Sequence, residues 1–418
     1  MKIQEITGKE FDILTRDHPQ ITFYQTSGWG KLKSFTGWRS LYLSYQNDEG
    51  ESRACGLFLL KKMPLLRSYL AYCPRGFLID YSDEELLKQF QKDLIPYLKK
   101  KGCFELIIDP YYPAQERDID GKAVEGGFDH RSTVELLKQL GYHHLGYNLH
   151  YENLQPRWLF RLDIRRPYSE LEKDFRYEAK RRSRKKDFLA IETRELSKEE
   201  IPVFKDLMED TAKRRGFLDR SLAYYEQMYE ALHEDGTLRY MAAEIDCEKA
   251  RKNVLKEIDT LQKRITRLNE HYEKNKGRIK EEEVTLKSQQ RLLEGIDACE
   301  KEYGAVAPLS VVALLCRGKE AIMLLAGNRE DYLQHFNTSN IIVTDLIRLA
   351  QKEGYDYYNF YGISGDFDTE NPDYGLYLYK RQYGGEVVEL IGQFEYTVNA
   401  LMKNLYEFLL KIYRLTKH

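Results

Sequence analysis

The sequence predicts an α/β protein of two domains that carries an inserted antiparallel coiled-coil arm. Three observations support this prediction. The length of 418 residues exceeds what one hydrophobic core usually organises, so two domains are expected. Short apolar stretches alternate with amphipathic helical patterns on both sides of residues 246–303. That segment is rich in charge and almost free of glycine and proline, which is typical of a long helical hairpin.

The composition limits the class of protein. Apolar residues make up 42% of the chain, and the formal net charge is only -2, so any site for a polyanion must be local. The six cysteines form no CxxC pair and fit a reducing compartment. The first residues lack the apolar core of a signal peptide, and the longest apolar run is too short to span a bilayer. We therefore expect a cytoplasmic protein, one that can still touch a membrane surface.

The first domain is expected to be a mixed α/β unit. Residues 38–45 and 54–62 predict neighbouring strands joined by a polar turn. The helical pattern that follows is expected to end at Gly102, because glycine commonly terminates helices. A buried strand then runs into Asp109 and Pro110, where the proline must end the pairing.

The second domain repeats this α/β style. Ser169 and Glu172 have the spacing of a capping box, which predicts a helix that runs to about Lys186. Residues 201–217 predict a further helix, and residues 236–245 predict a strand. The α/β pattern resumes after the arm, so the arm is an insertion in this domain.

The arm has an apolar seam with coiled-coil spacing. The first half steps by four and three through Val254, Ile258, Leu261, Ile265, Leu268 and Tyr272. The seam breaks at Gly277 and then resumes through Ile279, Leu286, Leu293 and Ile296. Two helices of roughly 25 residues would form a hairpin roughly 35 to 40 Å long. Cys247 and Cys299 would then meet at its base as two small apolar residues.

These patterns set the expected domain limits. The first domain covers residues 1–155 and the second covers 156–245 plus 304–396. The arm covers residues 246–303, and residues 397–418 form a C-terminal helix that packs back on the body.

The motifs of several enzyme classes are missing from the sequence. The nine histidines form no HExxH or HxH pattern, so no metal site is expected. No GxSxG elbow, P-loop or GxGxxG occurs, which argues against a serine hydrolase, a nucleotide hydrolase and a dinucleotide enzyme. Group transfer without a cofactor, by positioning and electrostatics, is the remaining chemistry.

Cations gather at three places, and each place has two interpretations. The stretch "RYEAKRRSRKK" from Arg176 to Lys186 suits RNA or a pyrophosphate, or forms a solvated helix face. Arg214 lies at a helix end just before Gly216, where a cation either binds a ligand or complements the helix dipole. Lys31 and Lys33 follow Trp29, and their spacing alone predicts exposed positions.

The stretch "YDYYNFYGISGDFDTENPDYGLYLYKRQYGG" contains Lys380 and many tyrosines. Tyrosine combines a stacking surface with a polar tip, which suits sugars, peptides or a terminal nucleotide. Aromatic core at a sheet edge is the alternative for these residues.

Together these segments resemble the FemABX family of peptidoglycan bridge-forming aminoacyltransferases. The resemblance covers nearly the whole chain. Its segments, in order, are "YQTSGWGKLK", "AYCPRGFLIDY", "LIIDPYYP", "SELEKDFRYEAKRRSRK", "DTAKRRGF", the helical arm, "FYGISGDF" and "LYLYKRQYGGEVVELIGQFEY".

The resemblance implies a fold of two GNAT-like acyltransferase domains with a projecting helical arm. It also implies transfer of an amino acid from aminoacyl-tRNA to the stem-peptide amine of a peptidoglycan precursor. The acceptor would be lipid II or a UDP-linked muramyl pentapeptide, and the arm favours the lipid-linked, FemA- or MurM-like branch. No cofactor is implied, and work at the inner face of the cell membrane fits such an acceptor.

The family's motifs also assign roles to residues. Lys380 matches the catalytic lysine of a Phe-Lys-x-x-Phe-Gly motif in which Tyr379 and Tyr383 replace both phenylalanines. Substrate-binding positions match Lys33, Asp109 and Arg214, and the tyrosines join this set. Contacts with tRNA or phosphate would come from Lys180, Arg181, Arg184 and Lys185. Phe77 follows Gly76 where the family usually has proline, so this turn departs from the family pattern.

The implied chemistry needs no cofactor. An aminoacyl ester is already activated, and a fixed ammonium such as Lys380 would stabilise the negative charge that develops on its carbonyl oxygen. The attacking amine needs a proton acceptor, for which Asp109 and a substrate phosphate are the two candidates. The rival functions are a CoA-dependent N-acyltransferase, whose pyrophosphate loop we do not find, and a non-catalytic RNA-binding or scaffold protein.

Overall fold

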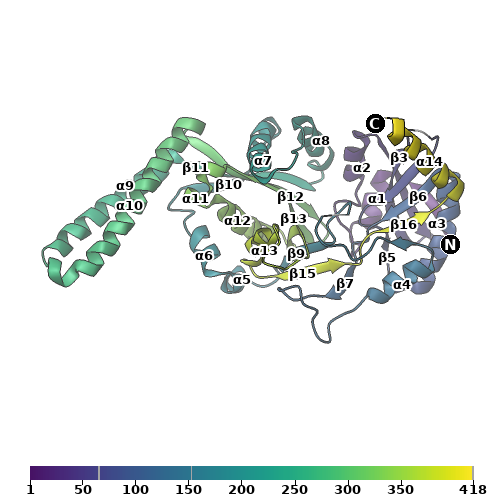
Figure 1. Cartoon of the computed structure of the whole chain (residues 1–418), viewed down its shortest axis with the longest axis horizontal. Helices are drawn as coiled ribbons and strands as arrows, with labels where there is room; N and C mark the ends of the chain where they lie inside the picture. Colours follow the sequence, from purple (N-terminus) through teal and green to yellow (C-terminus); the bar gives the residue numbers. More distant parts are fainter. Residues whose placement is uncertain (65, 152, 417–418) are drawn as a thin grey trace.

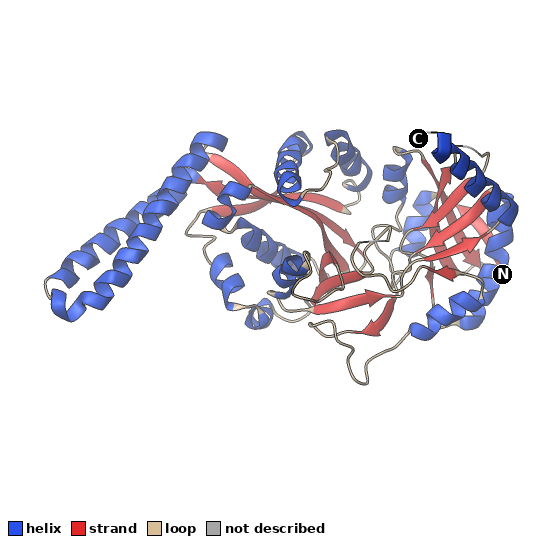
Figure 2. Cartoon of the chain, viewed as in Figure 1, coloured by secondary structure: helices blue, strands red, loops and turns tan. Residues whose placement is uncertain are grey.

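A computed structural model describes residues 1–64, 66–151 and 153–416. It confirms a mixed α/β architecture with two sheets of eight strands each. The sheets lie side by side, a helical hairpin projects from the second sheet, and the C-terminal helix lies at the opposite end (Figure 1). Helices flank both sheets (Figure 2). Within the described residues, no helix is both long enough and apolar enough to cross a membrane.

The first sheet has the order β1-β2-β3-β4-β6-β16-β8, and β5 pairs with β3. Its strands are β1 (Lys2–Ile6), β2 (Trp38–Gln46), β3 (Ser52–Lys62), β4 (Tyr69–Cys73), β5 (Leu78–Ile79), β6 (Cys103–Ile108), β8 (His143–His144) and β16 (Phe394–Thr397). The helices around it are α1 (Gly8–Thr15), α2 (Ser27–Ser34), α3 (Glu84–Lys100), α4 (Arg131–Gln139) and α14 (Ala400–Thr416).

The local predictions for this sheet are confirmed. Strands β2 and β3 are antiparallel neighbours, as the two apolar stretches predicted. Helix α3 begins after Asp83, whose side chain accepts a hydrogen bond from the Leu86 N–H, and the chain turns at Gly102 with a φ of 82°. Strand β6 ends at Ile108, directly before Asp109 and Pro110.

The second sheet has the order β10-β11-β12-β13-β14-β9-β15-β7. Its strands are β7 (Pro113–Glu116), β9 (Trp158–Asp163), β10 (Ile191–Glu195), β11 (Leu238–Asp246), β12 (Val306–Arg317), β13 (Glu320–Asn328), β14 (Tyr357–Ile363) and β15 (Glu386–Leu390). Its helices are α5 (Tyr168–Asp174), α6 (Tyr177–Ser183), α7 (Ile201–Arg215), α8 (Leu222–Leu232), α11 (Glu330–Phe336), α12 (Thr338–Lys352) and α13 (Tyr374–Arg381).

The two sheets exchange strands. Strand β7, from the first third of the chain, pairs with β15 in the second sheet. Strand β16, near the end of the chain, pairs with β6 and β8 in the first sheet. Strand β7 lies in the sequence among the strands of the first sheet, and β16 follows the last strand of the second sheet, so each of them joins the sheet opposite to its sequence neighbours. This exchange fixes the two sheets to each other.

The single helix predicted from Ser169 to Lys186 is wrong, because the structure has two short helices, α5 and α6. Pro167 precedes the first helix, so the predicted capping box does not form. Phe175 and Arg176 have extended backbone, with ψ of 142° and 149°. The physical reason is tertiary: the Phe175 side chain is 3% exposed in the core, and the Arg176 N–H donates to the Gln382 carbonyl at 2.8 Å.

The inserted arm is an antiparallel pair of helices, α9 (Cys247–Asn269) and α10 (Tyr272–Tyr303). Val254, Leu261, Ile279 and Ile296 are buried between or beneath them. Ion pairs also cross the hairpin, from Arg251 Nε to Asp297 at 2.8 Å and from Arg264 Nη1 to Glu282 at 3.3 Å.

The predicted turn position in the arm is wrong. The chain reverses at Glu270 and His271, whereas Gly277 lies inside α10. One glycine costs a helix only about 1 kcal/mol, which continued packing through Ile279 can offset. At the base of the arm, Cys247 and Cys299 are buried free thiols that contact each other, as the hairpin predicted.

The C-terminal helix α14 packs against β6. The ring of Tyr406 lies 5.3 Å from the ring of Phe104, and Lys403 Nζ lies 2.5 Å from the Glu105 carboxylate. These contacts hold one face of the helix on the first sheet.

Candidate active site

Lys380 is a buried lysine on a helix of the second sheet. It lies on α13 and is only 4% exposed, and its Nζ donates a hydrogen bond to the Gly362 carbonyl at 2.6 Å. Burial disfavours the charged form and lowers the pKa of Lys380 to about 7. A lysine poised near neutrality, away from bulk water, is typical of a functional group rather than of a surface charge.

The carbonyl that Lys380 contacts belongs to an irregular part of β14. The pairing of β14 with β9 shifts register between Asn359 and Gly362, and Tyr361 has a φ of 66°. The buried Asn359 side chain stabilises this strained residue, because its Oδ1 accepts the Tyr361 N–H at 2.8 Å. A side chain at Gly362 would come within 2.7 Å of Pro156. The bulge therefore aims one backbone carbonyl at the lysine.

A buried group of hydroxyls joins the two sheets beside this bulge. The Tyr361 and Tyr24 hydroxyl oxygens lie 2.6 Å apart, and both hydroxyls donate to Gln155 Oε1, at 2.9 and 2.6 Å. A cavity of about 10 Å³, room for one water, lies against Tyr24, Arg75 and Tyr361. The Tyr24, Gln155 and Tyr361 side chains thus form a buried polar contact beside the bulge.

Asp109 belongs to the same buried region and is 3% exposed. Its carboxylate accepts the Arg75 N–H at 2.7 Å and the Tyr72 hydroxyl at 3.0 Å, while burial raises its pKa. The Arg75 guanidinium in turn donates to the Pro156 carbonyl at 2.7 Å, and Pro156 packs on Gly362. The structure therefore connects Asp109 and Lys380 through one chain of contacts.

Lys33 is half-buried, not exposed as its spacing alone predicted. Its Nζ lies 4.5 Å from the centre of the Trp29 ring on α2, which explains the burial. Burial and, to a lesser degree, the nearby Arg220 lower the pKa of Lys33 to about 8. Among the described residues neither Lys33 nor Arg220 forms an ion pair with a carboxylate. Two such cations form a site suited to an anion.

Arg214 lies elsewhere, at the end of α7 before Gly216, where the helix end was predicted. Its Nε lies 2.5 Å from Glu330, and it lines a pocket of about 380 Å³ at the base of the arm. The pocket also contains Asp210, Arg329 and Tyr303. Lys33 contacts Trp29, Lys380 contacts Gly362 and Arg214 pairs with Glu330. The three cations share no partner, so the structure does not bring them together.

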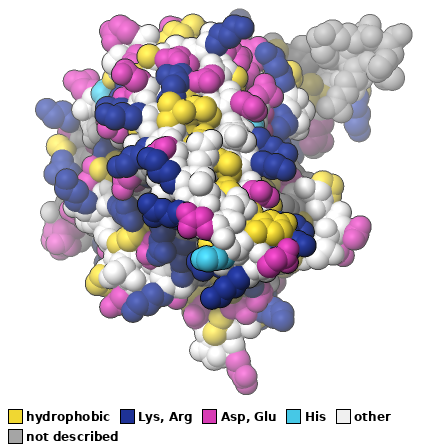
Figure 3. Space-filling model, turned by 90° about the vertical axis from the view of Figure 1, so that its left-hand side faces the viewer, with side chains coloured by type: hydrophobic (Ala, Val, Ile, Leu, Met, Phe, Trp, Pro, Cys, Tyr) yellow, Lys and Arg dark blue, Asp and Glu magenta, His cyan; other side chains and the backbone are white. Residues whose placement is uncertain are grey.

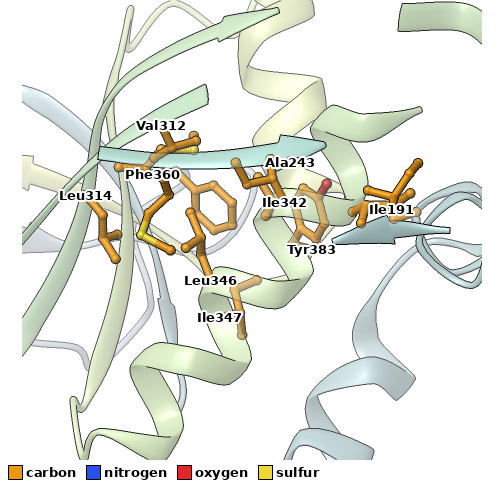
Figure 4. Close-up of a cluster of buried hydrophobic side chains, with 14 of the residues drawn as sticks. Ile191, Ala243, Val312, Leu314, Ile342, Leu346, Ile347, Phe360 and Tyr383 are labelled. Atoms are coloured by element: carbon orange, nitrogen blue, oxygen red, sulfur yellow. The ribbon is translucent and has the colours of Figure 1, made fainter. Parts of the chain in front are cut away.

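The two tyrosines beside Lys380 pack into the protein. Tyr383 is fully buried and belongs to the cluster that includes Ile342, Leu346 and Phe360 (Figure 4). Its hydroxyl accepts a hydrogen bond from Asn340 Nδ2 at 2.8 Å. Tyr379 is half-buried, and its hydroxyl donates to the Ser339 carbonyl at 3.0 Å. Their hydroxyls therefore have partners within the fold.

The four cations proposed to contact tRNA lie on or next to α6. Arg181 and Arg184 pair with Glu178 and Glu172, at 2.7 and 3.2 Å. Lys180 Nζ donates to a backbone carbonyl at 2.9 Å, and burial lowers the pKa of Lys185. Lys and Arg side chains are interleaved with Asp and Glu over the arm end of the molecule (Figure 3). The local excess of positive charge is thus smaller than the sequence suggested.

Sequence reasoning missed several residues around Lys380 and Lys33. Tyr361 and Asn359 lie in the aromatic stretch that it singled out, but only the bulge in β14 shows what they do. No sequence motif pointed to Arg220, because the residues between α7 and α8 have no periodic pattern. Among the described residues, no three His, Cys, Asp or Glu side chains lie close enough together to hold a metal ion.

Comparisons with known proteins agree with this architecture. The model of the FemAB family matches residues 6–411. The chain is 30% identical to aminoacyltransferase FemA of Staphylococcus epidermidis, over 99% of this chain and 100% of that protein. It is 29% identical to lipid II:glycine glycyltransferase of Staphylococcus haemolyticus, over 97% and 95% of the two chains. The crystal structure of FemX superposes with a TM-score of 0.76 at 26% identity and covers 97% of this chain and 99% of its own. The chain belongs to the FemAB family.

Proposed function

We propose that this protein transfers an amino acid from aminoacyl-tRNA to the stem-peptide amine of a peptidoglycan precursor, lipid II, to build an interpeptide bridge. Relatives that align along nearly the whole chain carry the names aminoacyltransferase and lipid II:glycine glycyltransferase. The observation that carries the proposal for this chain is the buried Lys380, whose pKa lies near 7 beside a strained backbone bulge. This is an aminoacyltransferase that uses a positioned lysine.

The reaction needs one bond made and one broken. The stem-peptide amine attacks the ester carbonyl, the new C–N bond forms, and the ester C–O bond breaks to release the tRNA hydroxyl. The Lys380 ammonium donates to the oxygen that becomes negative, in place of its present partner, the Gly362 carbonyl. The proton of the attacking amine passes to Asp109 or to a substrate phosphate, and the leaving alkoxide oxygen takes up a proton to become the tRNA hydroxyl.

Lys33 and Arg220 are proposed to hold the diphosphate of the acceptor. Among the described residues no carboxylate pairs with either cation, and this together with the partial burial of Lys33 supports the assignment. Asp109 is proposed to act from within the buried network. Arg214 would bind substrate only after it leaves Glu330. Tyr379 and Tyr383 would serve substrate binding by fixing the position of α13, since both are anchored within the fold.

The donor side is proposed to involve Lys180, Arg181, Arg184 and Lys185 together with the arm. Phosphate contacts by such cations bind RNA without reading its sequence. The pairs that Arg181 and Arg184 make with carboxylates are at the surface and would exchange for phosphate at little cost.

We also propose how the chain divides into domains. Residues 1–155 and 156–245 plus 304–396 would be two acyltransferase-like domains of the GNAT type, supported by the two sheets. The seam spacing supports a coiled coil at 246–303, and the contacts of α14 support a helix at 397–418 that packs on the body. Work in the cytoplasm, at the inner membrane face, would suit a lipid-linked acceptor, and the six cysteines are free thiols.

Transfer of labelled amino acids from a mixed charged-tRNA pool tests the function. We expect product with muramyl-peptide acceptors, lipid-linked or nucleotide-linked, and none after the tRNA is digested with RNase. Acetyl-CoA would serve as the alternative donor in a parallel reaction. Product that forms despite RNase, or only with acetyl-CoA, would contradict the proposal.

Replacing residues 248–300 by a short linker tests the arm. We expect weaker use of tRNA, seen as a higher KM for aminoacyl-tRNA, with the KM for the acceptor unchanged. The reason is that the arm projects away from α13, the helix that carries Lys380 (Figure 1). Circular dichroism and thermal unfolding of the remaining body serve as controls. Equal effects on both substrates, or no effect on either, would show that the arm has another task.

A further inference from the structure

The C-terminal helix α14 presents a row of apolar side chains to solvent. Leu401, Leu405, Phe408 and Ile412 are 82%, 43%, 59% and 43% exposed. Their spacing by four, three and four places them on one face of the helix. Tyr406 and Lys403 make the contacts with β6, so the packing of α14 on the first sheet leaves this row uncovered. We call these four residues the apolar row.

The charge of this helix points to one kind of partner. Residues 400–418 contain four Lys or Arg and a single acidic residue, Glu407, although the whole chain has a formal net charge of -2. Lys403 pairs with Glu105 on the side of the first sheet, whereas Lys411 is exposed next to Ile412. A helix with Leu and Phe on its exposed face and an excess of cationic residues in its sequence is typical of a segment that lies in the interface of an anionic membrane.

A second copy of the chain is a weaker explanation. The four side chains expose on the order of 400 Å² together, if each large apolar side chain has about 150 to 200 Å². A stable interface between proteins needs about 800 Å² on each partner. The apolar row is therefore too small for a dimer by itself, whereas insertion into lipid has no such minimum area.

We infer that α14 binds the surface of an anionic membrane, with the apolar row inserted between the lipid headgroups. This inference deepens the proposed function and rests on it in one respect: a lipid-linked acceptor is anchored in the membrane, so the enzyme must reach the membrane surface. The chain passes from Lys380 through β15 in the second sheet and β16 in the first sheet directly into α14. A helix held on the membrane would thus be tied to both sheets that enclose the site.

Flotation of the full chain with vesicles tests this inference. Wild-type protein is expected to bind vesicles of phosphatidylcholine and phosphatidylglycerol, and to bind pure phosphatidylcholine much less. The variant with Leu401, Leu405, Phe408 and Ile412 all changed to Ser should lose binding by about tenfold or more. A matched variant changes four equally exposed apolar residues on other helices, Ile13, Leu14, Leu255 and Val284, to Ser and should bind as wild type does.

Transfer assays separate this inference from the proposed function. The apolar-row variant should lose about tenfold in transfer to lipid II in vesicles but keep transfer to the nucleotide-linked acceptor. Vesicle binding that depends on the apolar row, in a protein without transferase activity on either acceptor, would support the membrane contact and reject the function. Equal vesicle binding by wild type and apolar-row variant would overturn the inference. So would a wild-type dimer that becomes monomeric in this variant and ignores vesicles.

Discussion

Lys380→Met is expected to reduce the rate of transfer by about 100-fold to 1000-fold, while the protein folds normally. Methionine fills the same buried space without a donor for the developing oxyanion. Losing one such donor typically costs about 3 to 4 kcal/mol of barrier. Single-turnover transfer with saturating acceptor measures the chemical step, and Lys31→Met, which removes an exposed lysine of α2, serves as the control.

The pH dependence of stability checks the state of Lys380 independently of activity. Its pKa is lowered from 10.5 to about 7 in the folded protein, so the unfolded state binds more protons between these two values. The destabilisation by the buried ammonium is fully present below about pH 7 and is relieved as pH rises toward the unfolded pKa. The stability advantage of Lys380→Met over wild type should therefore shrink by about 2 kcal/mol between about pH 7 and about pH 9. A difference in unfolding free energy that does not change with pH would show that Lys380 is not buried as a titrating group.

Gly385→Ala is expected to destabilise the protein by about 3 kcal/mol or more. Gly385 has a φ of 105°, and an added Cβ would lie 2.4 Å from the Arg161 carbonyl oxygen on β9. Because β15 begins at the next residue and pairs with β9, the clash would push these strands apart. It would also displace α13, which precedes this turn, so transfer should fall as well. Urea unfolding at neutral pH measures the stability change.

Gly354→Ala provides the matched control. Gly354 also has a positive φ, 85°, but an added Cβ there meets no atom within 4 Å. Alanine at this position should lower the free energy of unfolding only through the unfavourable backbone conformation, by about 1 to 2 kcal/mol. Similar losses in the two variants would mean that the close approach of Gly385 to β9 does not matter.

Much of the secondary structure could be predicted because it depends on local patterns. Alternating apolar residues specified β2 and β3, Gly102 specified the turn after α3, and Gly216 specified the end of α7. The family resemblance singled out Lys380 and Asp109, which the structure connects through buried contacts. These features need only the neighbouring sequence or a known motif.

Other features could not be predicted, because contacts between distant residues decide them. Phe175 leaves the helical conformation to enter the core, and this contact splits one expected helix into two. Arg220, almost 190 positions from Lys33 in the chain, lies close enough to contribute to the lowered pKa of Lys33, and no local pattern places these two cations together.

By itself the sequence determined the α/β class and the inserted helical hairpin and, through the family resemblance, the lysine on which the proposed chemistry depends. Only the tertiary structure decided how Lys380 titrates, which sheet β7 and β16 join, and which side chains lie beside the bulge in β14. The physical reason is the range of the interactions. Helix ends and strand alternation follow from residues a few positions apart, whereas desolvation of a lysine depends on every group that excludes water from it.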